Sequence, residues 1–219
     1  MSNDTPHSMG IGHLEGVASD SVEPYIKPTA DNPLGLEPTD AMIDLETLGT
    51  EPFAPLLSIG ACALRLDIPH AIDDMFYVPI QLESCLEVGM RPSGSTIQWW
   101  MTHESITQEA RDAAFSAPNA VPLATALDSF TDWLQSRPLK LWGNSARFDL
   151  GLLAAAYKVC GKTPPWNHWD ERCYRTLKNL PAAKDIKFVR VGTYHNAVHD
   201  AVSQALHLRQ INLQLQLHL

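Results

Sequence analysis

The sequence predicts an α/β fold in which a mixed sheet packs against helices. Short apolar runs typical of strands occur first along the chain, and segments of helical period follow, interrupted by a further apolar run. The links between the first runs are short, which favours antiparallel neighbours. Strands followed by mixed strands and helices are typical of a sheet with helices against it.

The first three apolar runs are predicted to form an antiparallel meander. They are "AMIDLETL" at 41–48, "PLLSIGACALRL" at 55–66 and "DMFYVPI" at 74–80. Parallel neighbours would need crossover connections of a dozen or more residues, which these links do not supply.

Helical patterns then cover three segments, "STIQWWMT" at 95–102, "ESITQEARDAAF" at 104–115 and "AVPLATALDSFTDWLQ" at 120–135. In the last of them an apolar face recurs at helix spacing, formed by Leu123, Leu127, Phe130 and Leu134. The apolar run "LKLWG" at 139–143 predicts a further short strand.

The second half of the chain predicts two longer helices. One covers 145–161, with Ser145 as its N-cap and Gly161 just past its end. The other covers 196–211 and places a stripe of apolar residues on one face: Ala197, Ala201, Ala205 and Leu208. The final segment "NLQLQLHL" fits an edge strand, a helix end or a dimer contact equally well.

Charge and composition divide the chain near residue 39. Residues 1–38 hold six acids and one base, are rich in Pro and Gly, and have no apolar period. We therefore predict a disordered acidic extension at 1–38 and one folded domain at 39–219. Of the formal net charge of −9, −5 lies in the extension and −4 in the domain, which at first argues against a polyanionic partner.

Features of the whole chain indicate a cytoplasmic protein without a membrane partner. No stretch reaches the roughly 18 consecutive apolar residues of a membrane helix. The N-terminus has neither the basic nor the apolar region of a secretory signal. The four cysteines are widely spaced, with no C-x-x-C pair, and are predicted to be reduced, buried thiols.

Two acids, Asp44 and Glu46, end the first apolar run. Residues i and i+2 of a strand point to the same side, so both carboxylates project together while Leu45 faces the other way. Either the strand has ended and both acids are solvated, or a divalent cation offsets their repulsion.

Further groups could complete such a cation site. Asp149 lies in the first turn of a helix, where an acid often serves only the helix dipole. Asp200 lies on the last helix among small apolar residues, and His195 precedes it by five positions. Each of these signals is weak alone, and a single histidine is more often structural than catalytic.

In chain order these residues form D-x-E, N-x-x-x-F-D from Asn144 to Asp149, and H-x-x-x-x-D from His195 to Asp200. This order resembles the DEDDh 3′–5′ exonuclease superfamily over residues 41 to about 209. Segments such as "DLETLGT", "STIQWW" and "HNAVHDA" resemble its phage-type group, whose members act on DNA or RNA ends. The resemblance implies a ribonuclease-H-like sheet of five strands, the meander plus parallel strands, flanked by helices. It also implies a host that is a bacterial cell or a phage-infected cell.

The mechanism that the resemblance implies is phosphodiester hydrolysis with two Mg²⁺ or Mn²⁺ ions. Asp44 would bridge both ions, Glu46 and Asp200 would bind the ion with the attacking water, and Asp149 would hold the second. His195 would accept the proton of that water.

One departure from the pattern is His199, at a position where relatives often have an acid. Adjacent helix residues point about 100° apart, so His199 should not replace Asp200 as a ligand. His199 would instead change the local charge or the metal preference of the site.

Substrate contacts are expected from seven further residues: Leu48, Gly49, Trp99, Asn144, Arg147, Phe148 and Arg175. Trp99 is a candidate platform for a base, although most tryptophans belong to the core. Residues 158–190 hold eight bases and three acids, which suits a phosphate backbone or, alternatively, a solvated surface.

The sequence is therefore consistent with three functions. The favoured one is a 3′–5′ exonuclease that acts on single-stranded or frayed DNA and releases nucleoside 5′-monophosphates. The second is an exoribonuclease with the same catalytic set, because sugar choice depends on contacts to the 2′-hydroxyl. The third is a non-catalytic nucleic-acid-binding module on the same fold. The expected partner is a single-stranded 3′ end, and a second copy of the chain in a homodimer is a further expectation.

Overall fold

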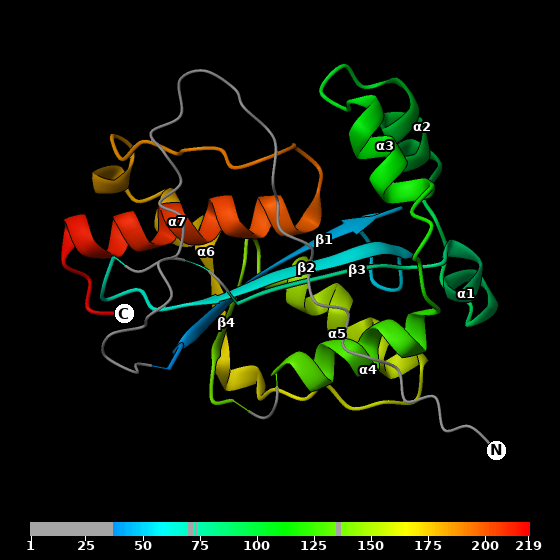
Figure 1. The fold of residues 1–219 in the computed structure, drawn as a ribbon, viewed down its shortest axis with the longest axis horizontal. Helices are drawn as coiled ribbons and strands as arrows, with labels where there is room; N and C mark the ends of the chain where they lie inside the picture. The colour runs from blue at the N-terminus through cyan, green and yellow to red at the C-terminus, as the bar shows by residue number, and fades with distance from the viewer. Residues whose placement is uncertain (1–36, 70–71, 73, 135–136) are drawn as a thin grey trace.

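The computed structural model describes residues 37–69, 72, 74–134 and 137–219 (Figure 1). The predicted extension at 1–38 lies outside the described residues, except for its last two. Disorder in that segment stays a prediction.

The centre of the fold is a mixed five-stranded sheet in the order β3-β2-β1-β4-β5. Its strands are β1 (Asp40–Thr47), β2 (Leu56–Leu64), β3 (Met75–Pro79), β4 (Lys140–Gly143) and β5 (Glu171–Cys173). β1, β2 and β3 pair antiparallel, whereas β4 pairs parallel to β1 and β5 parallel to β4. The predicted meander and the implied ribonuclease-H-like sheet are confirmed.

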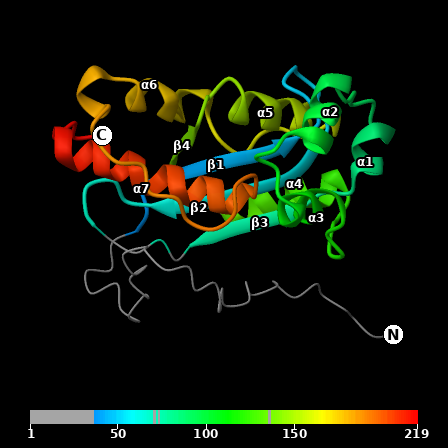
Figure 2. The ribbon, with the colours of Figure 1, turned by 90° about the horizontal axis from the view of Figure 1, so that it is seen from above.

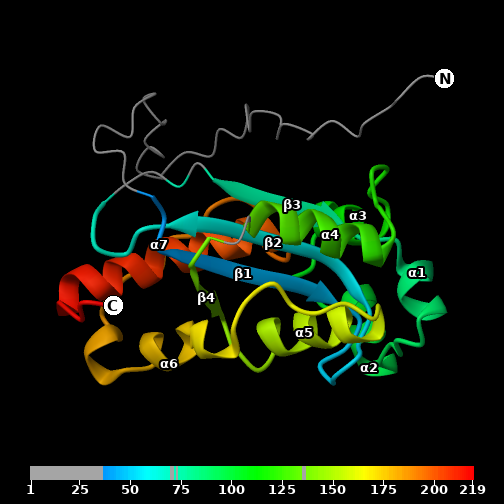
Figure 3. The ribbon, with the colours of Figure 1, turned by 90° about the horizontal axis from the view of Figure 1, so that it is seen from below.

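Helices cover both faces of this sheet (Figures 1 and 3). On one face α4 (Leu123–Leu134) and α5 (Asp149–Val159) pack over the strands, and all four residues of the predicted α4 face are buried. On the other face lie α7 (Ala197–Leu215) and the short α6 (Tyr174–Lys178).

The remaining α-helices gather at the end of the sheet where β1 stops (Figures 1 and 2). They are α1 (Leu82–Glu87), α2 (Gly94–Thr102) and α3 (Gln108–Phe115). Trp100 of α2 is the largest side chain of the small core there, and its indole Nε1 donates to the Thr47 carbonyl at 2.9 Å. This end of the molecule therefore closes over the last residues of β1.

The alternation of β1 decides which face receives its acids. Ala41, Ile43 and Leu45 pack into the core under α4 and α5, whereas Met42 packs into the core under α7. Residues of even number in β1 thus point towards α7, as the period of two requires. Asp44 and Glu46 share this direction.

The α7 helix lies close to the sheet because its inner face is made of small residues. Ala197, Ala201, Ala205 and Leu208 are all fully buried, as the predicted stripe requires. The helix extends beyond the predicted 211 to Leu215, so the first part of "NLQLQLHL" is a helix end. Gln216 follows in the left-handed conformation and terminates the helix.

Three predicted helix starts are wrong, and one of them is that of α4, which begins at Leu123 rather than at 120. α5 begins at Asp149 rather than near Ser145, because residues 144–148 form a turn in which the Ser145 carbonyl accepts from the Asp149 amide at 2.9 Å. α3 begins at Gln108, since Thr107 accepts a hydrogen bond from the Ala110 amide at 3.1 Å and caps the helix. The predicted Gly161 does lie just past the end of α5, with φ of +66°.

The cysteines agree only in part with the prediction of reduced, buried thiols. All four cysteines are free, but only Cys62 and Cys85 are buried, while Cys160 and Cys173 are half-buried. Within the described part of the chain, the helices are too short or too polar to cross a bilayer.

Candidate active site

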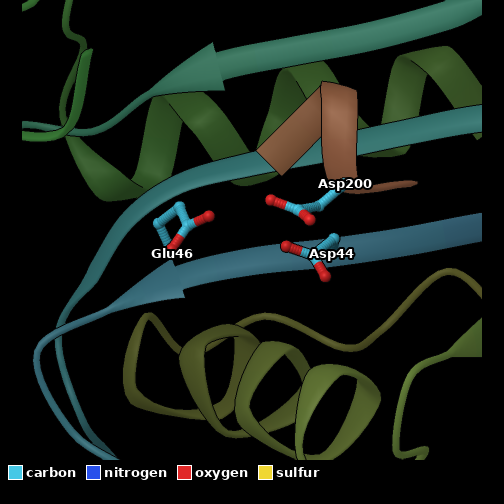
Figure 4. Close-up of side chains that lie close together, drawn as sticks. All are labelled: Asp44, Glu46 and Asp200. Atoms are coloured by element: carbon cyan, nitrogen blue, oxygen red, sulfur yellow. The ribbon is translucent and has the colours of Figure 1, made fainter. Parts of the chain in front are cut away.

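Three carboxylates converge between β1 and α7. Asp44 and Glu46 project from β1, Asp200 projects from the first turn of α7, and one oxygen of each lies within 4.8 Å of the others. Figure 4 shows the three side chains turned towards one another across the gap between strand and helix. The alternative in which both strand acids are simply solvated is therefore wrong, since Glu46 is only 7% exposed.

A glycine in β2 lets α7 come this close. Gly60 pairs with Asp44 across the strands, and a Cβ placed on it would lie 2.1 Å from the carbonyl carbon of Ala197. Any side chain at this position would push away the first turn of α7, which carries Asp200. Gly60 was not identified from the sequence.

We expect Gly60→Ala to lower stability by about 1–3 kcal/mol or more, as overpacked positions do, and to impair the site by displacing Asp200. Thermal unfolding together with the nuclease assay described below measures both effects. The matched control is Gly151→Ala in α5, where the nearest atom lies at 3.9 Å and alanine is the better helix former. Equal behaviour of the two variants would contradict this account of Gly60.

The fourth acid, Asp149, reaches the site from the opposite side. It is 2% exposed, and its Oδ2 accepts a hydrogen bond from the Ser145 amide at 3.1 Å. Gly143, at the end of β4, leaves room for it, because a Cβ there would lie 2.8 Å from Oδ2. Asp149 lies outside the group of three within 4.8 Å, but its charge acts directly on Asp44.

Burial and mutual repulsion make these acids reluctant to ionise. Burial, followed by the charges of Asp149, Glu46 and Asp200, raises the pKa of Asp44 well above its usual value. Burial, and then the charges of Asp200 and Asp149, does the same to the pKa of Glu46. Burial raises the pKa of Asp149 to about 7. The site therefore requires added positive charge to hold Asp44, Glu46 and Asp149 ionised.

Arg190 supplies part of that charge. Its Nη1 donates to Asp200 Oδ1, and the other oxygen, Oδ2, accepts from the backbone amide of His195 at 2.9 Å. From the sequence Arg190 was one of eight bases suited to a phosphate backbone, and its pairing with Asp200 was missed. Nothing in a linear pattern marks one arginine of that segment as the one that folds back.

Gln204 is a second residue that the sequence did not reveal. Its Nε2 donates to Asp44 Oδ1 at 2.7 Å, while Oε1 is buried without a partner among the described residues. Gln204 follows Asp200 by four positions on α7, hence on the same face of the helix. That spacing was the available signal.

His195 lies just before α7, in the left-handed conformation with φ of +61°. Its ring is half-buried against two tryptophans of α2, with centroid distances of 5.0 Å to Trp99 and 6.1 Å to Trp100. Burial lowers the pKa of His195, and the charge of Asp200 opposes that effect in part. The imidazole is therefore predominantly neutral at pH 7.

The acids open into a cleft of about 520 Å³, within the range of small-molecule sites. Of the seven expected substrate contacts, Trp99, Asn144 and Phe148 line it. Asn144 Oδ1 is buried and has no partner among the described residues. The further lining residues are Asp44, Leu45, Glu46, Thr47, Thr50, Ser95, Thr96, Trp100, His195, Asp200 and Gln204.

The other four expected contacts lie outside this lining. The Leu48 side chain is buried in the core between β1, α2 and α3, and a Cβ on Gly49 would lie 2.9 Å from Ala54. Arg147 and Arg175 are exposed, and the positive charge of Arg175 opposes in part the rise that burial causes in the pKa of Asp149. Contact of these four residues with a substrate stays a prediction.

A family model described as a "3′–5′ exoribonuclease Rv2179c-like domain" matches residues 39–212. No curated protein sequence matches the chain. The matched range covers most of the 219 residues and contains all five of the proposed catalytic positions.

Solved structures share the fold at low sequence identity. The nuclease domain of 3′hExo, a DEDDh family member bound to rAMP, is 15% identical with a TM-score of 0.53, and the match covers 83% of this chain and 94% of that one. E. coli exonuclease I in complex with a dT13 oligonucleotide is 13% identical with a TM-score of 0.55, and the match covers 83% of this chain and 43% of that one. S. pombe Pop2p in its Mg²⁺- and Mn²⁺-bound form is 11% identical with a TM-score of 0.53, and the match covers 80% of this chain and 83% of that one.

The chain spans less than half of exonuclease I and 64% of another matched structure, a cell-death related nuclease. The match to the family model, the ribonuclease-H-like sheet and the D-x-E, D and H-x-x-x-x-D motifs agree with one another. The chain therefore belongs to the Rv2179c-like 3′–5′ exoribonuclease family.

Proposed function

We propose that the protein hydrolyses the terminal phosphodiester bond at the 3′ end of single-stranded nucleic acid and releases nucleoside 5′-monophosphates. The observation that carries this proposal is the convergence of Asp44, Glu46 and Asp200 within 4.8 Å at the floor of a cleft. His195 lines the same cleft, and the charge of Asp149 acts on Asp44 from its edge of the sheet.

The donor set fits divalent cations. Carboxylate oxygens are the ligands that Mg²⁺ and Mn²⁺ prefer, and like charges at this range need a counter-charge that Arg190 alone does not provide. Asp44, Glu46 and Asp200 would hold one ion, and Asp44 with Asp149 a second. Such ions activate a water as nucleophile and stabilise the leaving oxygen of an in-line displacement.

His195 would act as the general base. Its lowered pKa keeps the imidazole neutral and able to accept a proton at pH 7. The contact with Trp99 fixes the ring at the cleft, and the backbone hydrogen bond to Asp200 fixes it relative to the acids.

The terminal nucleotide would occupy the cleft beside Trp99 and Phe148. Aromatic side chains stack on any base, which suits stepwise removal of nucleotides regardless of sequence. The unpartnered Oδ1 of Asn144 is an acceptor suited to a sugar hydroxyl.

RNA is the polymer that we propose, because the matching family is described as exoribonucleases. DNA, the expectation from the sequence, is the second candidate. The test is to incubate 5′-labelled single-stranded RNA and DNA of one sequence with the protein and Mn²⁺, beside an Asp44→Asn variant. Shortening of the RNA from its 3′ end would support the proposal. Shortening of the DNA alone would show that the substrate is DNA and not RNA. Binding of either polymer without cleavage would show that the protein is a non-catalytic binding module.

The pH dependence of this reaction follows from His195. A base acts when it is unprotonated, so a lowered pKa places the acidic limb of kcat below the usual histidine value of about 6.5. We expect kcat of the wild type to rise with pH through that limb. In the His195→Gln variant this rise should be absent. A limb that persists in the variant would assign it to another group.

A further inference from the structure

The loop before α7 carries the groups that contact Asp200. Arg190 donates to one oxygen of that carboxylate, and the backbone amide of His195 donates to the other. A displacement of this loop would therefore move the proposed base and one of the proposed metal ligands relative to each other.

No strand or helix holds residues 190–195 in place. Besides the His195 amide, two of their backbone amides donate to side chains of α7. The Thr193 amide donates to His199 Nδ1 at 3.1 Å, and the Val191 amide donates to Ser203 Oγ at 3.0 Å. His199 and Ser203 are four residues apart, so they form one edge of the helix along which the loop lies.

The loop at 190–195 also packs closely against the ring of His199. Gly192, between the two anchored amides, has φ of +64°, and a Cβ on it would lie 2.5 Å from His199 Cγ. Because glycine alone avoids this collision, the backbone packs directly on the imidazole. The ring of His199 thus faces the loop, although its neighbour in sequence, Asp200, faces the other acids.

We propose that His199 is a positioning residue, whose Nδ1 and ring hold the 190–195 loop so that His195 and Arg190 meet Asp200. The inference rests on the proposed exonuclease function. It replaces the expectation that His199 acts on local charge or metal preference.

The test compares His199→Leu with His199→Asn in the full chain. Leucine removes the acceptor, whereas the Oδ1 of asparagine lies one bond beyond Cγ, as Nδ1 does, and can accept from Thr193. We expect His199→Leu to lower kcat by about ten- to a hundredfold with little change in KM, the size typical of lost support around a metal site. His199→Asn should restore most of kcat, and Gly192→Ala should resemble the leucine variant.

Amide hydrogen exchange of the metal-free proteins gives a second readout. His199→Leu should speed exchange at residues 190–195 and leave α4 unchanged, whereas His218→Leu, at an exposed position near the C-terminus, should change neither exchange nor kcat. An unchanged kcat in His199→Leu, an asparagine variant no better than leucine, or unaltered loop exchange would each overturn the proposal. If the wild type cleaves neither polymer, the proposed function fails, and the exchange data still decide whether His199 holds the loop.

Discussion

Replacing Asp44 by asparagine is expected to lower the exonuclease rate by about a thousandfold or more. Charge stabilisation by bound cations is worth several kcal/mol, and each 1.36 kcal/mol is a factor of ten in rate. Asp44 lies next to Glu46, Asp149 and Asp200, so its loss would weaken both proposed ion sites at once. Single-turnover cleavage of labelled RNA measures the effect.

The same substitution should not unfold the protein. Asparagine keeps the shape of the side chain and removes one of four repelling charges, so the metal-free variant should melt at the wild-type temperature or above it. The control is Asp132→Asn, an exposed acid on α4 on the far side of the sheet, which should change neither rate nor melting. An Asp44→Asn protein that retained more than about a tenth of the wild-type rate would remove the basis for the mechanism.

The second large effect is on stability in the absence of metal. We expect the melting temperature in EDTA to fall by several degrees between about pH 6.5 and about pH 8. The pKa of Asp149 is raised to about 7 in the fold from an ordinary 3.8, and those of Asp44 and Glu46 are raised as well. In this window the native state binds protons that the unfolded state has already released, so stability falls as pH rises.

Two histidines act in the opposite direction but at lower pH. The pKa values of His195 and His199 are lowered by burial, so their contribution to stability is lost as pH falls below about 6.5. Most of the histidine contribution is already present at about pH 6.5, so scans by differential calorimetry at about pH 6.5 and about pH 8 report mainly the acids.

Mn²⁺ should reverse this trend. Divalent cations bind ionised carboxylates, so the gain in melting temperature on adding Mn²⁺ should be larger at about pH 8 than at about pH 6.5. Asp44→Asn should lose most of that gain. A metal-free protein whose stability is flat or rises across the window would show that the acids are not held together in the fold.

Much of the fold is readable from periodicity. The alternation of β1 placed Asp44 and Glu46 on one side with Leu45 on the other, and the alanine stripe of α7 identified its buried face correctly. These features depend on local geometry alone, in which side chains repeat every two or about 3.6 residues. The resemblance implied a fifth strand, but β5 has only three residues, too few to show any period, so its place in the sequence was not predicted.

The parts of the site that escaped prediction depend on contacts between distant segments. Gly60 matters because α7 lies against it, and Arg190 matters because its loop folds back onto Asp200. In the sequence Gly60 reads as a weak point in a strand, and Arg190 as one base in a basic segment. Their roles follow from packing in three dimensions, which the pattern of residues along the chain does not encode.

A crystal grown with Mn²⁺ shows whether the four acids converge to hold divalent cations. Anomalous scattering locates Mn²⁺ independently of the protein atoms. We expect manganese bound between Asp44, Glu46 and Asp200, with a second peak between Asp44 and Asp149. Manganese found only elsewhere, or none bound while the three carboxylates stay together, would contradict the account.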